Sequence, residues 1–230
     1  MLIEAIAIDI DGTITHSNRQ LDIAAVDPIR RAEKMGLRVI VATGNVLCFA
    51  EATSTLLGTT GPLIAEDGGV VYDKSEDQEY VIGSTEKVDE GVKLLEERFE
   101  HLQHTRTSEA RHAGRTLERT FDVNKALEVF REAGLDLQVV DSGFAIHIKD
   151  PEISKGNALE IVASLLKIST SEIAAIGDAP NDVEMLRKAG TSFAPSNSHP
   201  EAKEACSYAL DAPHGEGVKK AITKILKERD

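Results

Sequence analysis

The chain contains 230 residues, of which 41% are hydrophobic, enough to bury the core of one large domain or of two smaller ones. Its 39 acidic and 26 basic side chains give a formal charge of −13, which repels the phosphate backbone of nucleic acids and excludes them as expected partners. No apolar run approaches the ~20 residues needed to cross a bilayer, and no basic leader precedes the first apolar run, so we expect a cytoplasmic protein without a membrane partner.

Short apolar runs alternate with helical periods in the first third of the chain, which is typical of α/β proteins. The pattern predicts a buried strand over Ile3–Ile8, a helix over Asp22–Lys34 and a second strand over Leu37–Ala42. A third strand is predicted over Leu63–Ala65. The Asp-Gly-Gly run at 67–69 lies between apolar pairs, which indicates a hairpin whose two glycines are structural.

A different pattern covers residues 84–153. It begins with a helix over Glu86–Phe99 and two strand-like runs, and it continues with a helix over Asn124–Ala133 and two further runs at 137–141 and 145–150. This αββαββ order predicts an inserted α+β domain that has an antiparallel sheet of its own.

The βα alternation resumes after this insert. The remaining predicted elements are a helix over Gly156–Leu166, a strand over Ile173–Ile176, a helix over Asn181–Ala189, a strand-like run at 191–197 and a closing helix over Gly217–Lys227. We therefore expect an α/β fold in which residues 1–83 and 154–230 form a Rossmann-like parallel-sheet core. The α+β domain at 84–153 is inserted into that core.

Polar residues cluster where the predicted parallel strands end. Ligands of open parallel sheets collect outside the carboxyl ends of the strands, so these residues are expected to converge on one crevice. They are Asp9 and Asp11 after the first strand, Thr43, Gly44 and Asn45 after the second, Lys155 at the start of the helix that follows the insert, and Asp178, Asn181 and Asp182 after the next strand. Each fragment alone could be an ordinary loop or helix cap, but together they favour a reaction centre.

The pair Asp9 and Asp11 suits the hydrolysis of a phosphoester. A carboxylate can attack phosphorus and form an aspartyl-phosphate, which divides hydrolysis into two easier steps, and Asp9 emerges first from the strand as the nucleophile. Asp11 follows two residues later on the same face of an extended chain, so it can protonate the departing alcohol and then take a proton from water. Gly12 permits the sharp turn that such a loop needs.

The charge of the cluster indicates a divalent cation. Its four aspartates bring four negative charges and its lysine returns one, which leaves −3 facing a phosphate dianion. A divalent cation lowers this to −1, and oxygen ligands without nearby histidine or cysteine favour Mg²⁺ over zinc. His16, His199 and His214 have no partners at motif spacing, and we interpret them as solvated.

Four motifs, DIDGT, TGN, SKG and GDAPND, occur in this order along the chain. They resemble the four motifs of the haloacid dehalogenase superfamily of aspartyl phosphatases, and the insert resembles the α+β cap of its sugar-phosphatase-like branch. Within that branch, the compact cap and TGN in place of the commoner TGR are most similar to the archaeal phosphoglycolate phosphatases. The similarity covers essentially the whole chain.

The resemblance implies a role for each motif residue. As ligands of Mg²⁺ it implies Asp9, the backbone carbonyl of Asp11, Asp178 and, in direct or indirect contact, Asp182. As catalytic residues it implies Asp9, Asp11, Thr43 and Lys155. As substrate-binding residues it implies Gly44, Asn45, Lys155 and Asn181. In these roles Lys155 would neutralise the nucleophile and the phosphate, while the Thr43 hydroxyl and the Gly44 amide would donate to phosphate oxygens.

A basic segment of the insert, residues 101–119, contrasts with the acidic chain around it. It carries three histidines and four arginines, Arg106, Arg111, Arg115 and Arg119, against two glutamates. A cap over a phosphate site contacts the rest of the substrate, and a second anionic group there would need an arginine. A solvated loop is the alternative for any single arginine, but the patch as a whole favours a small acidic phosphoester over a neutral sugar phosphate.

The sequence thus predicts a Mg²⁺-dependent phosphomonoester hydrolase that acts through an aspartyl-phosphate on a small phosphorylated metabolite. The best single substrate is 2-phosphoglycolate, which would give glycolate and phosphate. A sugar-phosphate phosphatase, a mannosyl-3-phosphoglycerate phosphatase and a phosphomutase remain as alternatives. A phospho-switch is disfavoured, because Asp11 could destroy its phosphoaspartate and a switch needs no cap. A homodimer is compatible with the sequence.

Overall fold

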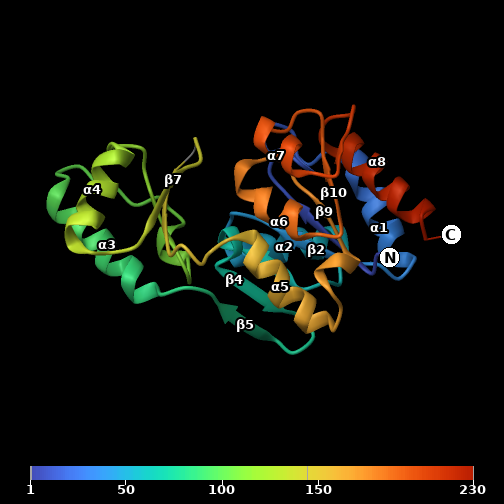
Figure 1. Cartoon of the computed structure of the whole chain (residues 1–230), viewed down its shortest axis with the longest axis horizontal. Coiled ribbons are helices and arrows are strands. Elements are labelled where there is room, and N and C mark those ends of the chain that lie inside the picture. The colour runs from blue at the N-terminus through green and yellow to red at the C-terminus, as the bar shows by residue number, and fades with distance from the viewer. Residues whose placement is uncertain (1, 144, 230) are drawn as a thin grey trace. The chain divides into compact units, whose positions relative to one another are not determined.

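Two separated segments of the chain fold into one unit, and the segment between them folds into another. The computed structural model describes residues 2–143 and 145–229 (Figure 1). The first unit comprises the chain up to Tyr80 and from Ser154 onward, and the second comprises Val81–Ile153. The boundaries expected from the sequence, 84 and 153, lie within three residues of this division.

An eight-stranded sheet forms the framework of the first unit. In spatial order its strands are β11 (Tyr208–Ala209), β10 (Thr191–Ala194), β9 (Ile173–Ile176), β1 (Ala5–Asp9), β2 (Arg38–Ala42), β3 (Leu63–Ala65), β4 (Val70–Asp73) and β5 (Gln78–Val81). The strands from β11 to β3 pair in parallel, and β4 is antiparallel to β3. The predicted α/β class and the predicted hairpin between β3 and β4 are therefore confirmed.

The central strand β1 is buried along its whole length. Its five residues are apolar up to Asp9, as expected for a strand of a parallel sheet covered on both faces. In the register of the sheet, Ile8 pairs with Ile176 of β9, and Asp9 pairs with Ala42 of β2. The chain order reverses on either side of β1, so the carboxyl end of this strand is the switch point where ligands of such sheets bind.

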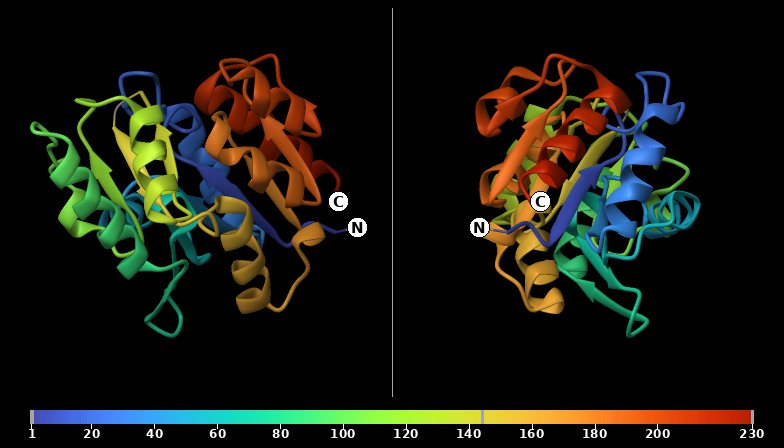
Figure 2. Two further views of the ribbon diagram at one scale, coloured as in Figure 1. Left: turned by 60° about the vertical axis from the view of Figure 1, so that its left-hand side comes forward. Right: turned by 90° about the vertical axis from the view of Figure 1, so that its right-hand side faces the viewer.

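Helices pack against the strands of the first unit. They are α1 (Val26–Lys34), α2 (Leu47–Leu57), α5 (Lys155–Leu166), α6 (Val183–Lys188), α7 (Pro200–Ala205) and α8 (His214–Lys227). The C-terminal α8 packs beside α1, and α6 packs between α5 and α7 (Figure 2). The elements α2, α7, β5 and β11 were not predicted from the sequence. Among the described residues, no helix combines the length and apolarity that crossing a membrane requires.

The second unit has fewer strands than the sequence predicted. Its elements are α3 (Thr85–Arg98), β6 (Arg115–Leu117), α4 (Val123–Ala133), β7 (Gln138–Asp141) and β8 (Ile146–Lys149). The three strands form an antiparallel sheet in the order β6-β8-β7. Where a further strand was expected before β6, the described chain makes one isolated bridge between His104 and Leu117. The αββαββ prediction is wrong at this element, because residues 101–114 form turns and a short 3-10 helix (Ser108–Ala110) stabilised by local hydrogen bonds.

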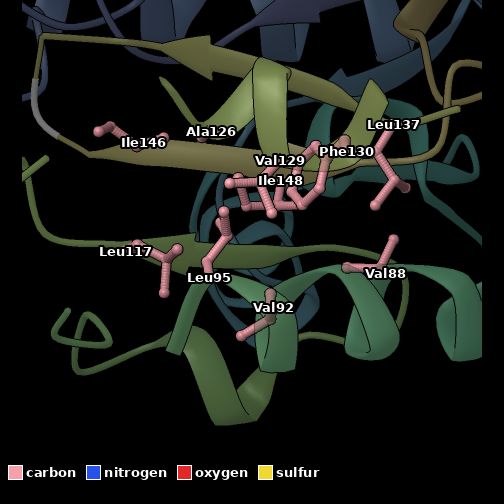
Figure 3. Packing of buried hydrophobic residues seen from close by; sticks show 10 residues of the cluster. All are labelled: Val88, Val92, Leu95, Leu117, Ala126, Val129, Phe130, Leu137, Ile146 and Ile148. Carbon is pink, nitrogen blue, oxygen red and sulfur yellow. The ribbon is translucent and has the colours of Figure 1, made fainter. Parts of the chain in front are cut away.

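The second unit has its own hydrophobic core. Apolar side chains from α3 and α4 meet those of the small sheet in one cluster (Figure 3). Its buried members are Val88, Val92, Leu95, Leu117, Ala126, Val129, Phe130, Leu137, Ile146 and Ile148. Phe130 is the largest of these side chains and is 1% exposed. A separate core is what an inserted domain needs to fold as a unit.

Truncating Phe130 to alanine should destabilise the second unit selectively. A buried Phe→Ala change costs about 3–5 kcal/mol, because it removes apolar contacts and leaves a cavity. Amide hydrogen exchange should therefore accelerate mainly within residues 81–153. Phe193→Ala is the matched control, since Phe193 is fully buried in β10 of the first unit, and its effect should fall on the parallel sheet. Equal acceleration in both units for either variant would contradict separate cores.

Candidate active site

Three acidic side chains meet at the carboxyl edge of the parallel sheet. Asp9 ends β1, while Asp178 and Asp182 lie in the loop and turn after β9. Each of the three offers a carboxylate oxygen, and these oxygens all lie within 4.8 Å of one another. The parallel topology thus gathers residues that are more than 160 positions apart in the sequence.

The Lys155 side chain links two of these carboxylates. It is fully buried at the first residue of α5, and its Nζ lies 2.5 Å from Asp9 Oδ1 and 2.6 Å from Asp182 Oδ1. Burial alone would lower the pKa of Lys155, but the negative charges of Asp182 and Asp9 raise it above its ordinary value. Lys155 is therefore a permanent cation between the two aspartates.

Asp9 is a buried carboxylate with one oxygen available to a ligand. The residue is 5% exposed, and among the described residues no hydrogen-bond donor reaches its Oδ2. Burial is the main cause that raises the pKa of Asp9 well above its ordinary range, followed by the charge of Asp182, although Lys155 opposes both. A buried, unpartnered carboxylate oxygen is costly unless a ligand or cation takes it, which makes this atom the focus of the site.

Asp178 lies next to Asp9 and is less deeply buried. Burial, followed by the charge of Asp182, raises the pKa of Asp178 to about 6. Its Oδ1 accepts a hydrogen bond from the Thr13 hydroxyl at 2.9 Å. A Cβ on Gly12 would collide with the Asp178 carboxylate, and Gly12 has a φ of +88°, so the turn after β1 requires glycine.

Asp182 anchors the loop that carries Asp178. Its Oδ2 accepts the backbone N–H groups of Asp178 and Ala179 at 2.9 and 3.0 Å, while its Oδ1 accepts from Lys155. These bonds occupy both oxygens of a fully buried carboxylate. Asp9 and Asp178 therefore have more lone pairs left to coordinate a cation than Asp182 has. A site made only of oxygen ligands fits Mg²⁺.

Asp11 lies on the open side of the site. Its side chain is 36% exposed, and its Oδ2 accepts a 2.6 Å hydrogen bond from Asn45 Nδ2. The buried Thr43 hydroxyl oxygen accepts from both the backbone N–H and the amide of Asn45. Arg19, which the sequence analysis did not identify, donates from Nε to Asp11 Oδ1 at 2.8 Å.

A second missed residue is Asp67, in the turn after β3. It is buried, and its Oδ1 accepts a 2.7 Å hydrogen bond from Asn181 Nδ2. A Cβ on Gly44 would lie 2.7 Å from the same oxygen, so Asp67 lies directly behind the TGN loop. The hairpin prediction for the Asp-Gly-Gly run assigned no role to Asp67. The strand-end rule that selected the other residues also applies to β3 and would have identified Asp67.

One histidine was interpreted wrongly. His214 is half-buried, and its Nδ1 lies 2.8 Å from the carbonyl oxygen of Gly12, which also accepts from Asn197 Nδ2 at 2.9 Å. His214 therefore contacts the loop that follows β1 and is not a solvated side chain. His16 and His199 are exposed, as predicted.

The basic segment of the second unit is partly neutralised within that unit. Arg115 forms an ion pair with Asp89 at 2.8 Å, and Arg119 forms one with Asp141 at 2.9 Å. Arg111 is buried, whereas Arg106 is exposed. The segment is thus less basic toward solvent than its composition indicates.

The raised pKa of Asp178 makes the stability of the metal-free protein depend on pH. The charged form of Asp178 is disfavoured in the folded state. Its contribution to the free energy of unfolding is therefore greatest below the ordinary pKa of 3.8 and is lost as the pH rises through about 6. In EDTA, Asp178→Asn should therefore gain stability over the wild type as the pH rises from about 4 to 7, by up to about 3 kcal/mol. Denaturant unfolding at several pH values measures this difference.

The same experiment with MgCl₂ provides the control. A cation that binds the folded carboxylates should stabilise the wild type more than Asp178→Asn, which has lost one negative oxygen donor. A stability difference that stays constant from pH 4 to 7 in EDTA would contradict the electrostatic account.

Comparisons with known proteins agree with the motifs. A family model of the haloacid dehalogenase-like hydrolases matches residues 6–114 and 122–222. The chain is 39% identical over 222 residues to a phosphoglycolate phosphatase of Methanothermobacter thermautotrophicus, covering 96% of this chain and 98% of the relative. It is 41% identical to a phosphoglycolate phosphatase of Archaeoglobus fulgidus, covering 95% of each chain.

The fold has close counterparts among solved structures. The crystal structure of Thermoplasma acidophilum 0175 superposes with a TM-score of 0.87 at 26% sequence identity, covering 98% of this chain and 99% of that one. A haloacid dehalogenase-like hydrolase from Bacteroides thetaiotaomicron has the same fold, with a TM-score of 0.80 at 20% identity over 97% of this chain and 99% of that one. Motifs, fold and sequence similarity together show that the chain belongs to the haloacid dehalogenase-like hydrolase family and is a phosphatase of that family.

Proposed function

We propose that the protein is a Mg²⁺-dependent phosphomonoesterase that hydrolyses 2-phosphoglycolate to glycolate and phosphate through an aspartyl-phosphate. The observation that carries the proposal is the buried Asp9 carboxylate, whose Oδ1 is paired with Lys155 and whose Oδ2 has no donor among the described residues. The substrate is inferred from the two relatives of about 40% identity, both named as phosphoglycolate phosphatases.

Mg²⁺ would be held by Asp9, Asp178 and the backbone carbonyl of Asp11, with Asp182 supporting the site through Lys155 and the loop after β9. The close approach of three carboxylates and the raised pKa values of Asp9 and Asp178 support this assignment, since a cation offsets their repulsion. When bound, the cation would lower the negative charge that an incoming phosphate meets and polarise a phosphoryl oxygen.

In the first chemical step, Asp9 attacks phosphorus and the bond between phosphorus and the ester oxygen breaks. Asp11 gives its proton to the departing glycolate oxygen, which leaves as the alcohol. Lys155 holds the charge of the attacking carboxylate, and the Thr43 hydroxyl and Gly44 amide donate to the phosphoryl oxygens. Because Thr43 Oγ1 already accepts from Asn45, its own proton is free to be directed to the substrate.

In the second step, Asp11 takes a proton from water while the water oxygen attacks phosphorus. The bond between phosphorus and the Asp9 oxygen breaks, and the products are inorganic phosphate and the free Asp9 carboxylate. Asn181, held by Asp67, would orient groups around the phosphate. Residues 84–153 would select the substrate. Arg106 and Arg119 are exposed arginines of the basic segment, and since Arg119 is paired with Asp141, Arg106 is the candidate that would bind the substrate carboxylate.

Phosphate release across a panel of substrates tests the proposal. The panel contains 2-phosphoglycolate, hexose phosphates, mannosyl-3-phosphoglycerate and an aryl phosphate, each measured with Mg²⁺ and with EDTA. We expect the highest kcat/KM for 2-phosphoglycolate and loss of activity in EDTA. Preference for a neutral sugar phosphate would contradict 2-phosphoglycolate as the substrate but leave the phosphatase mechanism in place. Phosphate transfer without release would indicate a mutase.

Asp9→Asn should abolish phosphate release. An amide cannot act as the nucleophile, and removing a nucleophile from a catalytic unit typically costs about 10⁴-fold or more in kcat. Because the side chain keeps its shape, thermal unfolding should still be cooperative. Asp27→Asn, which changes an acid in the first turn of α1, is the matched control and should keep wild-type activity. Normal turnover by Asp9→Asn would rule out Asp9 as the nucleophile.

A further inference from the structure

We propose that Arg19 is a positioning residue for Asp11, which it orients as the proton donor to the leaving group. This inference rests on the proposed phosphatase function and adds a residue that lies outside the four motifs. Arg19, Asp11 and Asn45 form a closed ring of three hydrogen bonds. Arg19 Nε donates to Asp11 Oδ1 at 2.8 Å, Asn45 Nδ2 donates to Asp11 Oδ2 at 2.6 Å, and Arg19 Nη2 donates to Asn45 Oδ1 at 3.0 Å.

The ring fixes the orientation of the Asp11 carboxylate. Each oxygen has a different donor, so rotation of the side chain would break at least one charge-assisted bond. Asn45 also donates to Thr43 Oγ1 at 3.0 Å, so it can release Asp11 Oδ2 and keep a partner. Arg19 would then hold Oδ1, while Oδ2 turns to the ester oxygen of the substrate. The geometry thus assigns the anchoring role to one oxygen and proton transfer to the other.

A loop with defined backbone contacts places Arg19 beside Asp11. The chain leaves the site at Thr15 and returns at Leu21, and these two residues form an isolated antiparallel bridge. Within the loop, the Arg19 N–H donates to the His16 carbonyl at 2.8 Å. Arg19 has a φ of +66°, a conformation that costs a non-glycine residue of order 1 kcal/mol, so the surrounding contacts hold it there.

The environment of the guanidinium is consistent with a positioning role. Its Cζ lies 5.7 Å from the centroid of the Phe49 ring, so the group is held by an aromatic face as well as by Asp11 and Asn45. The Arg19 side chain is 51% exposed, which means that it contributes little to the buried core. Its hydrogen bonds go to Asp11 and to Asn45, which itself binds Asp11. Lys155, by contrast, pairs with Asp9, the other proposed catalytic carboxylate.

The test compares two leaving groups in wild type, Arg19→Gln and Arg19→Lys. Glycolate is a poor leaving group that needs a proton, whereas the p-nitrophenolate of p-nitrophenyl phosphate departs without one. General acid catalysis contributes about 10²–10⁴-fold, so a misplaced Asp11 should slow single-turnover formation of the phospho-enzyme from 2-phosphoglycolate by about 10- to 100-fold. This rate isolates the leaving-group step, because the second step, in which Asp11 is the proposed base, comes after it. Single-turnover formation of the phospho-enzyme from p-nitrophenyl phosphate should change far less, and KM should stay close to the wild-type value.

Arg19→Lys should restore part of the lost rate, since an ammonium can reach one carboxylate oxygen but cannot bridge to Asn45 as a guanidinium does. Arg30→Gln is the matched control, because Arg30 on α1 donates only to the backbone carbonyls of Leu56 and Leu57 among the contacts shown, and it should behave as wild type. Thermal unfolding verifies that each variant folds. If Arg19→Gln does not fold, Arg19→Lys carries the same comparison.

Equal losses on both substrates, or a change confined to KM, would overturn the positioning role of Arg19 while leaving the phosphatase function intact. A wild-type protein that releases no phosphate from either substrate would overturn the proposed function and this inference together. A loss of the phospho-enzyme formation rate that is selective for 2-phosphoglycolate and partly restored by lysine supports the assignment.

Discussion

The buried ammonium of Lys155 is the interaction on which the site depends. It lies between Asp9 at the end of β1 and Asp182 after β9, and it connects α5 to two neighbouring strands. Removing one partner of a buried ion pair leaves an uncompensated charge and typically costs about 3–5 kcal/mol. The pairing therefore constrains the chain after the insert to return to the same sheet edge, with Lys155 at the start of α5.

Even with Lys155, the site carries more negative charge than it can stabilise alone. Burial and mutual repulsion raise the pKa values of Asp9 and Asp178, and Asp9 Oδ2 is left without a donor among the described residues. Binding of a cation and a phosphoryl group would relieve this repulsion, so the unfavourable charges favour ligand binding, as expected for a phosphatase. The same charges thus lower the stability of the metal-free fold and raise the affinity of the site for a cation.

Residues outside the motifs hold the motif residues in place. Asp67 binds the Asn181 amide, His214 contacts the Gly12 carbonyl, and Arg19 binds Asp11. These three contacts were not predicted from the sequence, because none of the residues has a fixed spacing from its partner: the separations in the chain are 114, 202 and 8 residues. Only the position of Asp67 at a strand end, and not its partner, could be predicted from the sequence. Only the folded chain brings such pairs together, and hydrogen bonds of this kind leave no periodic pattern in the sequence.

The sequence by itself determined the α/β class, the insertion and the motif residues. Apolar runs of strand length and polar residues at strand ends are local patterns that follow from burial and from the parallel sheet. The tertiary structure decided which carboxylates carry raised pKa values and which oxygen of Asp9 lacks a donor among the described residues. It also decided that Arg115 and Arg119 are paired with acids of their own unit. It also reduced the predicted strands before α4 to β6 and one bridge. These outcomes depend on distances between residues far apart in the chain, because solvation and charge interactions act through space and not along the sequence.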